Sequence, residues 1–168
     1  VSFSIVRKIP DTRIVSQARH VCGPIGYAAY RLPGSQALGD IIADEFEKGF
    51  HAVIMENHGT VVGGYNLADC FLRFETLEFC ARTILYAHMI GNPSYLTEEE
   101  ITAFDQQLPE LLPEMDTTEY SSSERAVRTE ICSIVQRACS QGLMTSSYGT
   151  ISRRWEGNNF LITPTDVP

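Results

Sequence analysis

The sequence has little positive charge and no long hydrophobic run. It contains 13 Lys and Arg residues against 21 Asp and Glu residues, so its formal net charge at pH 7 is 13 − 21 = −8. A protein that binds nucleic acid needs a basic surface to neutralise phosphates, and this composition therefore argues against a nucleic-acid partner. No apolar stretch approaches the length of a transmembrane helix, so we expect no membrane partner either.

The cysteines lack the spacing of a metal site or a redox motif. The chain has five cysteines and no CxxC pair, and the odd number leaves one cysteine over in any disulfide scheme. Four of the five lie in segments with a helical pattern, namely Cys70, Cys80, Cys132 and Cys139. We therefore expect buried, reduced thiols and a cytoplasmic protein.

Histidine is scarce, and only His58 lies where a metal ligand is expected. It is part of the run Glu-Asn-His-Gly-Thr-Val-Val-Gly-Gly at 56–64. The apolar segments 51–55 and 60–62 on either side predict two paired strands with His58 in the turn between them. We interpret the other three histidines as structural: His20, His51 and His88.

Two predicted helices flank this pair of strands. Ser35 is a suitable N-cap for a helix that ends at Gly49 and carries apolar residues on one face. Asn66 is a suitable N-cap for a long second helix. Apolar residues at steps of three and four predict one buried stripe along that helix. The predicted core positions are Leu67, Phe71, Phe74, Leu77, Ala81, Ile84 and His88.

The rest of the chain divides into two dissimilar parts. Residues 109–120 are acidic, contain two prolines and are predicted to be a linker between a first part, 1–108, and a second part, 121–168. The remaining predicted elements are a strand over 1–10, an irregular segment over 11–34, a short acidic helix over 98–106, a helix that begins at the capping pattern Ser121-x-x-Glu124, and strands over 149–153 and 160–163.

With the elements placed in this way, residues 33–88 resemble the class II aldolase/adducin family. The resemblance is carried by Pro33-Gly34-Ser35, by the run from Val53 to Gly64, and by the helix from Leu67 to Ala81. It implies an α/β fold with three layers, in which a mostly antiparallel central sheet lies between helices. Only part of such a fold is expected in this chain.

Residues 124–168 also resemble this family, but they match its beginning, and they are close to the fuculose-phosphate aldolases. The segments Ser146–Arg154 and Phe160–Pro168 correspond to the first and second substrate loops. The chain is therefore predicted to run from the C-terminal part of one domain (1–108), through a linker (109–120), into the N-terminal part of a second domain (121–168). A permuted, incomplete single domain is the alternative.

The resemblance implies site residues in both parts. The family holds a divalent metal, usually zinc, with three histidines, of which only His58 has a match here. The other two histidines and the acid/base glutamate have no match, so no catalytic residue is assigned. An anion or substrate site is implied at Gly149, Thr150, Thr165 and Asp166. Thr150 replaces the usual asparagine there, and Asp166 replaces the usual glycine.

The implied function is that of a metal-dependent aldehyde-lyase, present as a fragment. Such an enzyme cleaves a small sugar phosphate or hydroxy acid by aldol chemistry, in which the metal stabilises an enediolate and a carboxylate moves the proton. Two alternatives stay open: a catalytically silent scaffold of the adducin type, and a metal-dependent decarboxylase on the same fold. The resemblance also implies a homo-oligomer.

Overall fold

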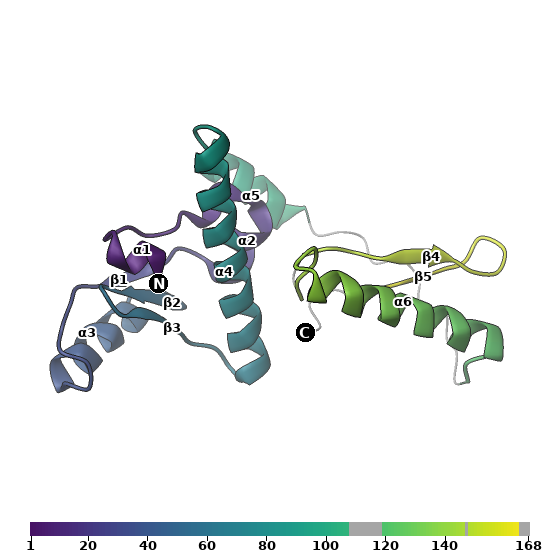
Figure 1. The fold of residues 1–168 in the computed structure, drawn as a ribbon, viewed down its shortest axis with the longest axis horizontal. Coiled ribbons are helices and arrows are strands. Elements are labelled where there is room, and N and C mark those ends of the chain that lie inside the picture. Colours follow the sequence, from purple (N-terminus) through teal and green to yellow (C-terminus); the bar gives the residue numbers. More distant parts are fainter. Residues whose placement is uncertain (108–118, 147, 165–168) are drawn as a thin grey trace. The chain divides into compact units, whose positions relative to one another are not determined.

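The structure, a computed structural model, describes residues 1–107, 119–146 and 148–164 and divides into two compact units, Val1–Leu108 and Pro109–Pro168 (Figure 1). Each unit is described by itself. The first contains α1 (Ser2–Ile5), the 3₁₀ helix η1 (Thr12–Ile14), α2 (Ser16–Cys22), β1 (Gly26–Ala28), α3 (Gln36–Glu47), β2 (Ala52–Met55), β3 (Gly59–Val62), α4 (Leu67–Ile90) and α5 (Glu98–Gln106). The second contains α6 (Ser122–Ser140), β4 (Ser152–Arg154) and β5 (Phe160–Ile162).

A three-stranded sheet in the order β1-β2-β3 organises the first unit. The central strand β2 pairs antiparallel with β3, with Met55 opposite Gly59, and parallel with β1, with Tyr27 opposite Ile54. The predicted strand pair around His58 is thus confirmed. Because β2 lies between two strands and under helices, its first three residues are buried, as its continuous apolar sequence predicts.

The helices with strong local start signals are confirmed. The Ser35 side chain accepts a hydrogen bond from the Leu38 N–H at the start of α3, and Asn66 accepts one from Asp69 at the start of α4. Helix α5 begins with a complete capping box, in which Thr97 and Glu100 each bond to the other's backbone N–H. Such caps satisfy backbone donors that the first helical turn leaves free, so they fix the start of a helix locally.

The predicted strand over residues 1–10 is wrong. Residues 2–5 form the short helix α1, and the Ser4 side chain, which is fully buried, donates a hydrogen bond to the Val1 carbonyl at 2.7 Å. The Ser4 carbonyl accepts from the Asn57 N–H at 3.2 Å. The alternation of apolar and polar residues is typical of a strand, but this contact with the β2–β3 turn selects the helical conformation, because tertiary context overrides weak local preference.

The predicted irregular segment, 11–34, contains α2 and β1. Helix α2 ends at Gly23, whose φ of 62° lies in the left-handed region that favours glycine. Strand β1 has only three residues, two of them Gly and Ala, so its sequence carries little strand signal. It exists because it pairs with β2, which lies 27 residues further along the chain, with Ile54 opposite Tyr27.

The predicted buried stripe of α4 is wrong over most of its length. Leu77 and Ile84 are buried, but Leu67 is 88% exposed, and Phe71, Phe74 and His88 are exposed as well. The buried face instead includes Thr76 and Cys80. The helix is apolar on several faces, so periodicity alone does not select one. Small side chains let α4 approach α2 closely, and that contact selects the face.

The core of the first unit lies between α2, the sheet and α4. Its central cluster consists of Cys22, Ile25, Ala52, Ile54 and Leu77. All five cysteines of the chain lie in the described residues and are free thiols, as expected. The expectation that they are buried holds for Cys22 and Cys80, whereas the two cysteines of α6 are exposed.

The second unit packs α6 against the two-stranded antiparallel sheet β4-β5. The Ser121 side chain accepts a hydrogen bond from the Glu124 N–H, as its capping position predicts. The turn between the strands is closed by a hydrogen bond from the Trp155 N–H to the Asn159 carbonyl. Among the residues that the structure describes, no helix is both long and apolar enough to cross a membrane.

Candidate functional site

His58 lies at the tip of the β2–β3 connection, and its side chain is exposed. Its backbone N–H donates to the Met55 carbonyl at 3.1 Å, which closes a tight turn. The turn requires Asn57 to take a left-handed conformation with φ 53°. Asparagine tolerates this region better than most residues that carry a Cβ atom. The pair Asn57-His58 therefore presents an imidazole to solvent from a defined backbone.

Two segments that are distant in the sequence form hydrogen bonds with the backbone of the turn. The Asn57 N–H donates to the Ser4 carbonyl of α1 at 3.2 Å, and the Glu56 N–H donates to the Ala28 carbonyl at the end of β1 at 2.9 Å. Both backbone donors of the turn are thus satisfied by other elements. A turn with its donors paired in this way has less freedom than an isolated hairpin loop.

The Glu56 carboxylate adds a side-chain anchor next to His58. It accepts a hydrogen bond from the Tyr30 N–H at 3.1 Å and pairs with Arg7 Nε at 2.7 Å. The Tyr30 N–H, with help from Tyr27 and Arg7, holds the pKa of Glu56 below its usual value. Burial, and then the hydrogen bond with Glu56, raise the pKa of Tyr27. Glu56 therefore stays ionised and ties the turn to the segment after β1.

Gly64 closes the same region on the side of α4. A Cβ atom at this position would lie 2.6 Å from Asp69 Oδ2 and 3.0 Å from Cys70 Sγ. Asp69 cannot move aside cheaply, because its carboxylate accepts from the Tyr65 N–H at 3.0 Å and pairs with Arg73 at 2.9 Å. The glycine is therefore required by the close approach of the chain to the first turn of α4.

The residues around His58 do not make up a complete metal site. Within the described parts of the chain, no group of three or more His, Cys, Asp and Glu side chains is placed to hold one ion. A single imidazole does not satisfy the four-coordinate preference of zinc. The turn can supply one ligand, and a metal there would need further ligands from outside the described residues or from another chain.

The predicted anion site lies in the second unit and is described only in part. Thr165 and Asp166 lie outside the described residues. Gly149 has φ 107°, and Thr150 next to it is exposed. A Cβ atom at Gly149 would overlap the Met144 side chain, so the residue is constrained twice.

The two loops predicted to bind an anion come together at one end of the β4-β5 pair. The Thr163 N–H donates to the Ile151 carbonyl at 3.0 Å, and the Ile151 N–H donates to the Thr163 hydroxyl at 3.2 Å. These bonds place Thr150 beside the start of the second loop. Whether an anion binds there stays a prediction.

Sequence reasoning did not identify the Glu56 anchor or the roles of Arg13 in η1 and Arg19 on α2. Glu56 interacts with residues 26 and 49 positions away, so no local motif marks it. The family resemblance implies a catalytic tyrosine near η1, where the chain has Arg13 or Ile14, and Arg13 pairs with Asp11 at 2.6 Å. No pattern in the sequence predicts that pair beyond the short spacing of an acid and a base.

The comparisons with known proteins agree on one family. The family model described as "Class II Aldolase and Adducin N-terminal domain" matches residues 1–85, which include the His58 turn and most of α4. A 5-deoxy-D-ribulose 1-phosphate aldolase from Bacillus thuringiensis is 35% identical over 74 residues, which are 44% of this chain and 34% of that protein.

Solved structures agree in fold. An L-fuculose 1-phosphate aldolase has a TM-score of 0.50 at 29% identity, over 63% of this chain and 49% of that one. YgbL from Klebsiella pneumoniae, a protein proposed to be an aldolase, epimerase or decarboxylase, has a TM-score of 0.52 at 26% identity, over 61% of this chain and 50% of that one. The chain thus spans about half the length of these structures and about a third of the curated relative.

Proposed function

Because this chain belongs to the family of class II aldolases and adducins, we propose that it is part of an aldehyde-lyase that cleaves a carbon–carbon bond in a small sugar phosphate or hydroxy acid. Two of the relatives described above are aldolases whose names specify a sugar 1-phosphate. They support the phosphorylated substrate over the hydroxy acid.

The observation that carries this proposal is the geometry of the His58 turn. An imidazole is exposed at the tip of a hairpin whose Glu56 and Asn57 backbone donors and Glu56 carboxylate are bonded to other elements, and whose following glycine, Gly64, lies against the start of α4. A surface histidine without a role needs no such support. A metal ligand does, because its position must be fixed to a fraction of an ångström.

The proposed cofactor is a divalent metal, zinc in the first instance, with His58 as one of its ligands. Such a metal supplies a Lewis acid that stabilises negative charge on substrate oxygens. What this chain contributes is the placement of the imidazole by Asn57, the ionised Glu56 beside it, and the exposure that lets further ligands approach. The remaining ligands would come from outside the described residues or from a second chain.

The proposed anion site at Gly149, Thr150, Thr165 and Asp166 would serve the substrate phosphate. Backbone N–H groups and hydroxyls at glycine-containing turns are suited to this task. The carboxylate of Asp166 opposes it, because two negative groups in one site repel each other. A substrate with a single carboxylate in place of the phosphate reduces this conflict, and it is the reason to test hydroxy acids and decarboxylation as well.

The decisive experiment is elemental analysis of metal in the intact purified protein, comparing wild type, His58→Ala and His51→Ala. His51 is also exposed and lies just before β2, so it is a matched control. We expect stoichiometric metal in wild type and in His51→Ala, loss of metal in His58→Ala, and loss of aldol cleavage of a sugar 1-phosphate in parallel. A wild type without metal, or with metal that survives His58→Ala, contradicts the proposal.

A second candidate function, a scaffold of the adducin type without lyase chemistry, is favoured by one observation. Where the family resemblance implies a catalytic tyrosine, this chain has Arg13 or Ile14, and Arg13 forms a hydrogen-bonded pair with Asp11. A guanidinium in such a pair cannot act as a proton donor at neutral pH. Cleavage activity in the experiment above rules out the scaffold function. A protein with neither cleavage activity nor bound metal supports the scaffold function.

We further propose a cytoplasmic homo-oligomer. The five free cysteines support a reducing compartment, where disulfides are rare. The incomplete ligand set at His58 supports an assembly in which another chain completes the site. Light scattering of the intact protein, with and without metal, tests the oligomer directly.

A further inference from the structure

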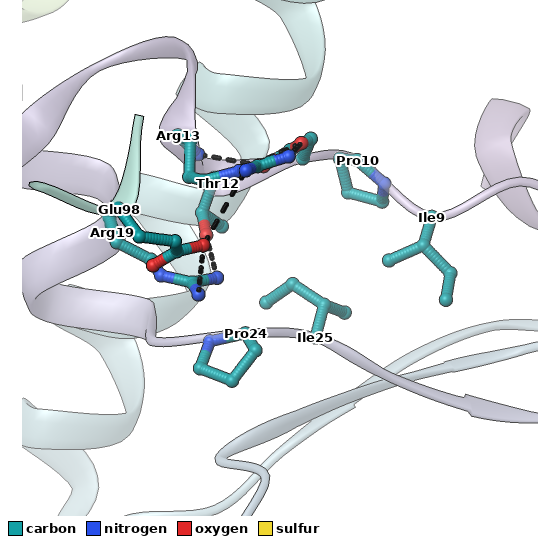
Figure 2. Close-up of a pocket in the computed structure, with 9 residues that line it drawn as sticks. Ile9, Pro10, Thr12, Arg13, Arg19, Pro24, Ile25 and Glu98 are labelled. Carbon is teal, nitrogen blue, oxygen red and sulfur yellow. Dashed lines mark hydrogen bonds and ion pairs between the residues drawn. The ribbon is translucent and has the colours of Figure 1, made fainter. Parts of the chain in front are cut away.

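A cleft of about 410 Å³ in the first unit is lined by two arginines and two carboxylates (Figure 2). Asp11 and Arg13 lie at the start of η1, Arg19 lies on α2, and Glu98 is the first residue of α5. Three separate elements therefore bring charged groups to one opening. The proposed lyase chemistry uses none of these four residues.

The rest of the cleft lining consists of Thr12 and of four apolar residues. The apolar residues are Ile9, Pro10, Pro24 and Ile25, which lie on the segments before η1 and after α2. Figure 2 shows Ile25 and Pro24 on the side of the opening across from Arg13. The cleft thus joins a charged end to an apolar end, as a binding site for a small amphiphilic molecule does.

Arg13 is held firmly by Asp11. Its Nη2 lies 2.6 Å from Asp11 Oδ2, and its Nε lies 3.1 Å from Asp11 Oδ1. This fork geometry is the strong form of an arginine–carboxylate pair. The Arg13 guanidinium accordingly lowers the pKa of Asp11, which stays ionised. The Asp11–Arg13 pair is therefore a fixed, nearly neutral part of the wall.

Arg19 is placed differently. Its Nη1 lies 3.4 Å from the hydroxyl oxygen of Thr12, which is itself buried and donates to the Gly23 carbonyl at 2.8 Å. Its Nη2 lies 3.4 Å from Glu98 Oε1. Glu98 is the one carboxylate with which it forms an ion pair among the described residues. Thr12 thus orients the Arg19 side chain without neutralising it.

Glu98 bridges the two arginines loosely. Its Oε1 lies 3.5 Å from Arg13 Nη1 and 3.4 Å from Arg19 Nη2, and its side chain is 60% exposed. Long contacts of an exposed pair contribute little to stability. Its position at the start of α5 favours a negative charge whether or not the arginines are near. Glu98 can therefore leave the arginines at little cost.

We propose that this cleft binds a small monocarboxylate with an apolar body, whose carboxylate replaces that of Glu98 between Arg13 and Arg19. Glu98 itself shows which chemistry the two guanidinium groups accept at that point. With Glu98 withdrawn, the cleft carries two arginines against Asp11 alone, so one added negative charge restores neutrality. A ligand with two negative charges would leave the cleft with a net negative charge, and the site therefore prefers a carboxylate to a doubly charged phosphate. The apolar wall then covers the body of the ligand.

The test is an NMR titration of the intact protein, with cyclohexanecarboxylate as the probe and its neutral amide, cyclohexanecarboxamide, as the matched probe. Inorganic phosphate is the third probe. We expect the carboxylate to shift the Nε–H resonances of Arg13 and Arg19, with a Kd of roughly 1 mM for a ligand of this size. The amide and phosphate are expected to bind at least about tenfold more weakly, because the amide carries no charge, and phosphate has no apolar body and is in part doubly charged at neutral pH.

Three variants distinguish this site from nonspecific binding. Glu98→Gln removes the competing charge, so the carboxylate is expected to bind about three- to tenfold more tightly. Glu99→Gln makes the same change of net charge outside the cleft lining and is expected to leave binding unchanged. Arg19→Met is expected to weaken binding at least about tenfold, whereas Arg82→Met, an exposed arginine on α4, is not.

The gain of affinity in Glu98→Gln keeps the proposal testable even if Arg19→Met fails to fold. Equal binding of the acid and the amide would overturn it, and so would an affinity that does not change in Glu98→Gln. The His58→Ala variant is titrated as well. Since His58 does not line this cleft, the carboxylate is expected to bind that variant normally, so failure of the lyase proposal and failure of this one are distinguishable.

Discussion

Asn57 offers a sharp test of how the His58 turn is built. Its φ of 53° lies in the left-handed region, which disfavours a residue with a Cβ atom by roughly 1–2 kcal/mol. Glycine has no Cβ atom and avoids this steric cost, whereas a β-branched residue bears the whole of it. We therefore expect Asn57→Val to destabilise the β2–β3 hairpin by about 1–2 kcal/mol, Asn57→Ala by somewhat less, and Asn57→Gly by little.

Hydrogen exchange measured by NMR resolves this effect within the intact protein. A loss of one to two kcal/mol changes an opening equilibrium by a factor of about 5–30, so the amides of β2 and β3 are expected to exchange faster by that factor in Asn57→Val. The amides of α6 belong to the second unit and serve as the internal control. The metal content of the same variants then shows whether the turn conformation matters to the proposed ligand.

The order of the three variants decides the outcome. Steric strain predicts Gly, then Ala, then Val, in order of increasing exchange rate. If Asn57→Val and Asn57→Gly exchange at the same rate, the left-handed backbone is not what fixes the turn. If Asn57→Gly is the least protected of the three, the backbone freedom that glycine adds outweighs any relief of strain, and the reasoning from φ is refuted.

Three further predictions concern the first unit. Leu77→Ala is expected to lower the free energy of unfolding by about 2–5 kcal/mol, and Phe71→Ala on the exposed face by much less; urea unfolding that shows equal losses would contradict the assigned buried face. Burial raises the pKa of the Cys22 and Cys80 thiols to about 12, so iodoacetamide at pH 8 is expected to alkylate the other three cysteines first, as mass spectrometry can show. The Tyr30 N–H lowers the pKa of Glu56, so ionised Glu56 stabilises the fold above its unfolded-state pKa, and this stability is lost as the pH falls through the lower folded-state pKa. Glu56→Gln is therefore expected to flatten the pH dependence of the free energy of unfolding below about pH 5. An unchanged profile would contradict the anchoring role of Glu56.

Gly64→Ala tests the closing of the site at α4. The added methyl group would lie within 3.0 Å of both Asp69 Oδ2 and Cys70 Sγ, and the Asp69 carboxylate cannot withdraw without losing its bonds to the Tyr65 N–H and Arg73. We expect a loss of about 1–3 kcal/mol in the free energy of unfolding. Gly39→Ala, in α3 with nothing near its Cβ position, is the matched control and is expected to be neutral or stabilising.

Local signals in the sequence account for the elements that were predicted well. Ser35, Asn66, Thr97 and Ser121 each cap a helix through a hydrogen bond within three residues, so the start of each helix needs no tertiary contact. The β2–β3 pair is likewise local, because its partners are joined by a short turn with the residues that such a turn requires. The position of His58 at the tip follows from these local features.

Elements that depend on distant partners were not predictable in this way. Strand β1 is defined by pairing with β2, and α1 takes its conformation next to the β2–β3 turn. The buried face of α4 is selected by α2, since the helix is apolar around most of its circumference.

The sequence by itself therefore determined helices α3, α4, α5 and α6, the hairpin and the histidine at its tip, because hydrogen bonds between near neighbours specify each of them. Only the tertiary structure decided how that histidine is supported and where the second candidate site lies. Glu56 reaches Arg7 and Tyr30, and Glu98 reaches Arg13 across 85 residues of chain. Contacts of such separation leave no periodic or local signal, because the folded chain alone brings their partners within reach.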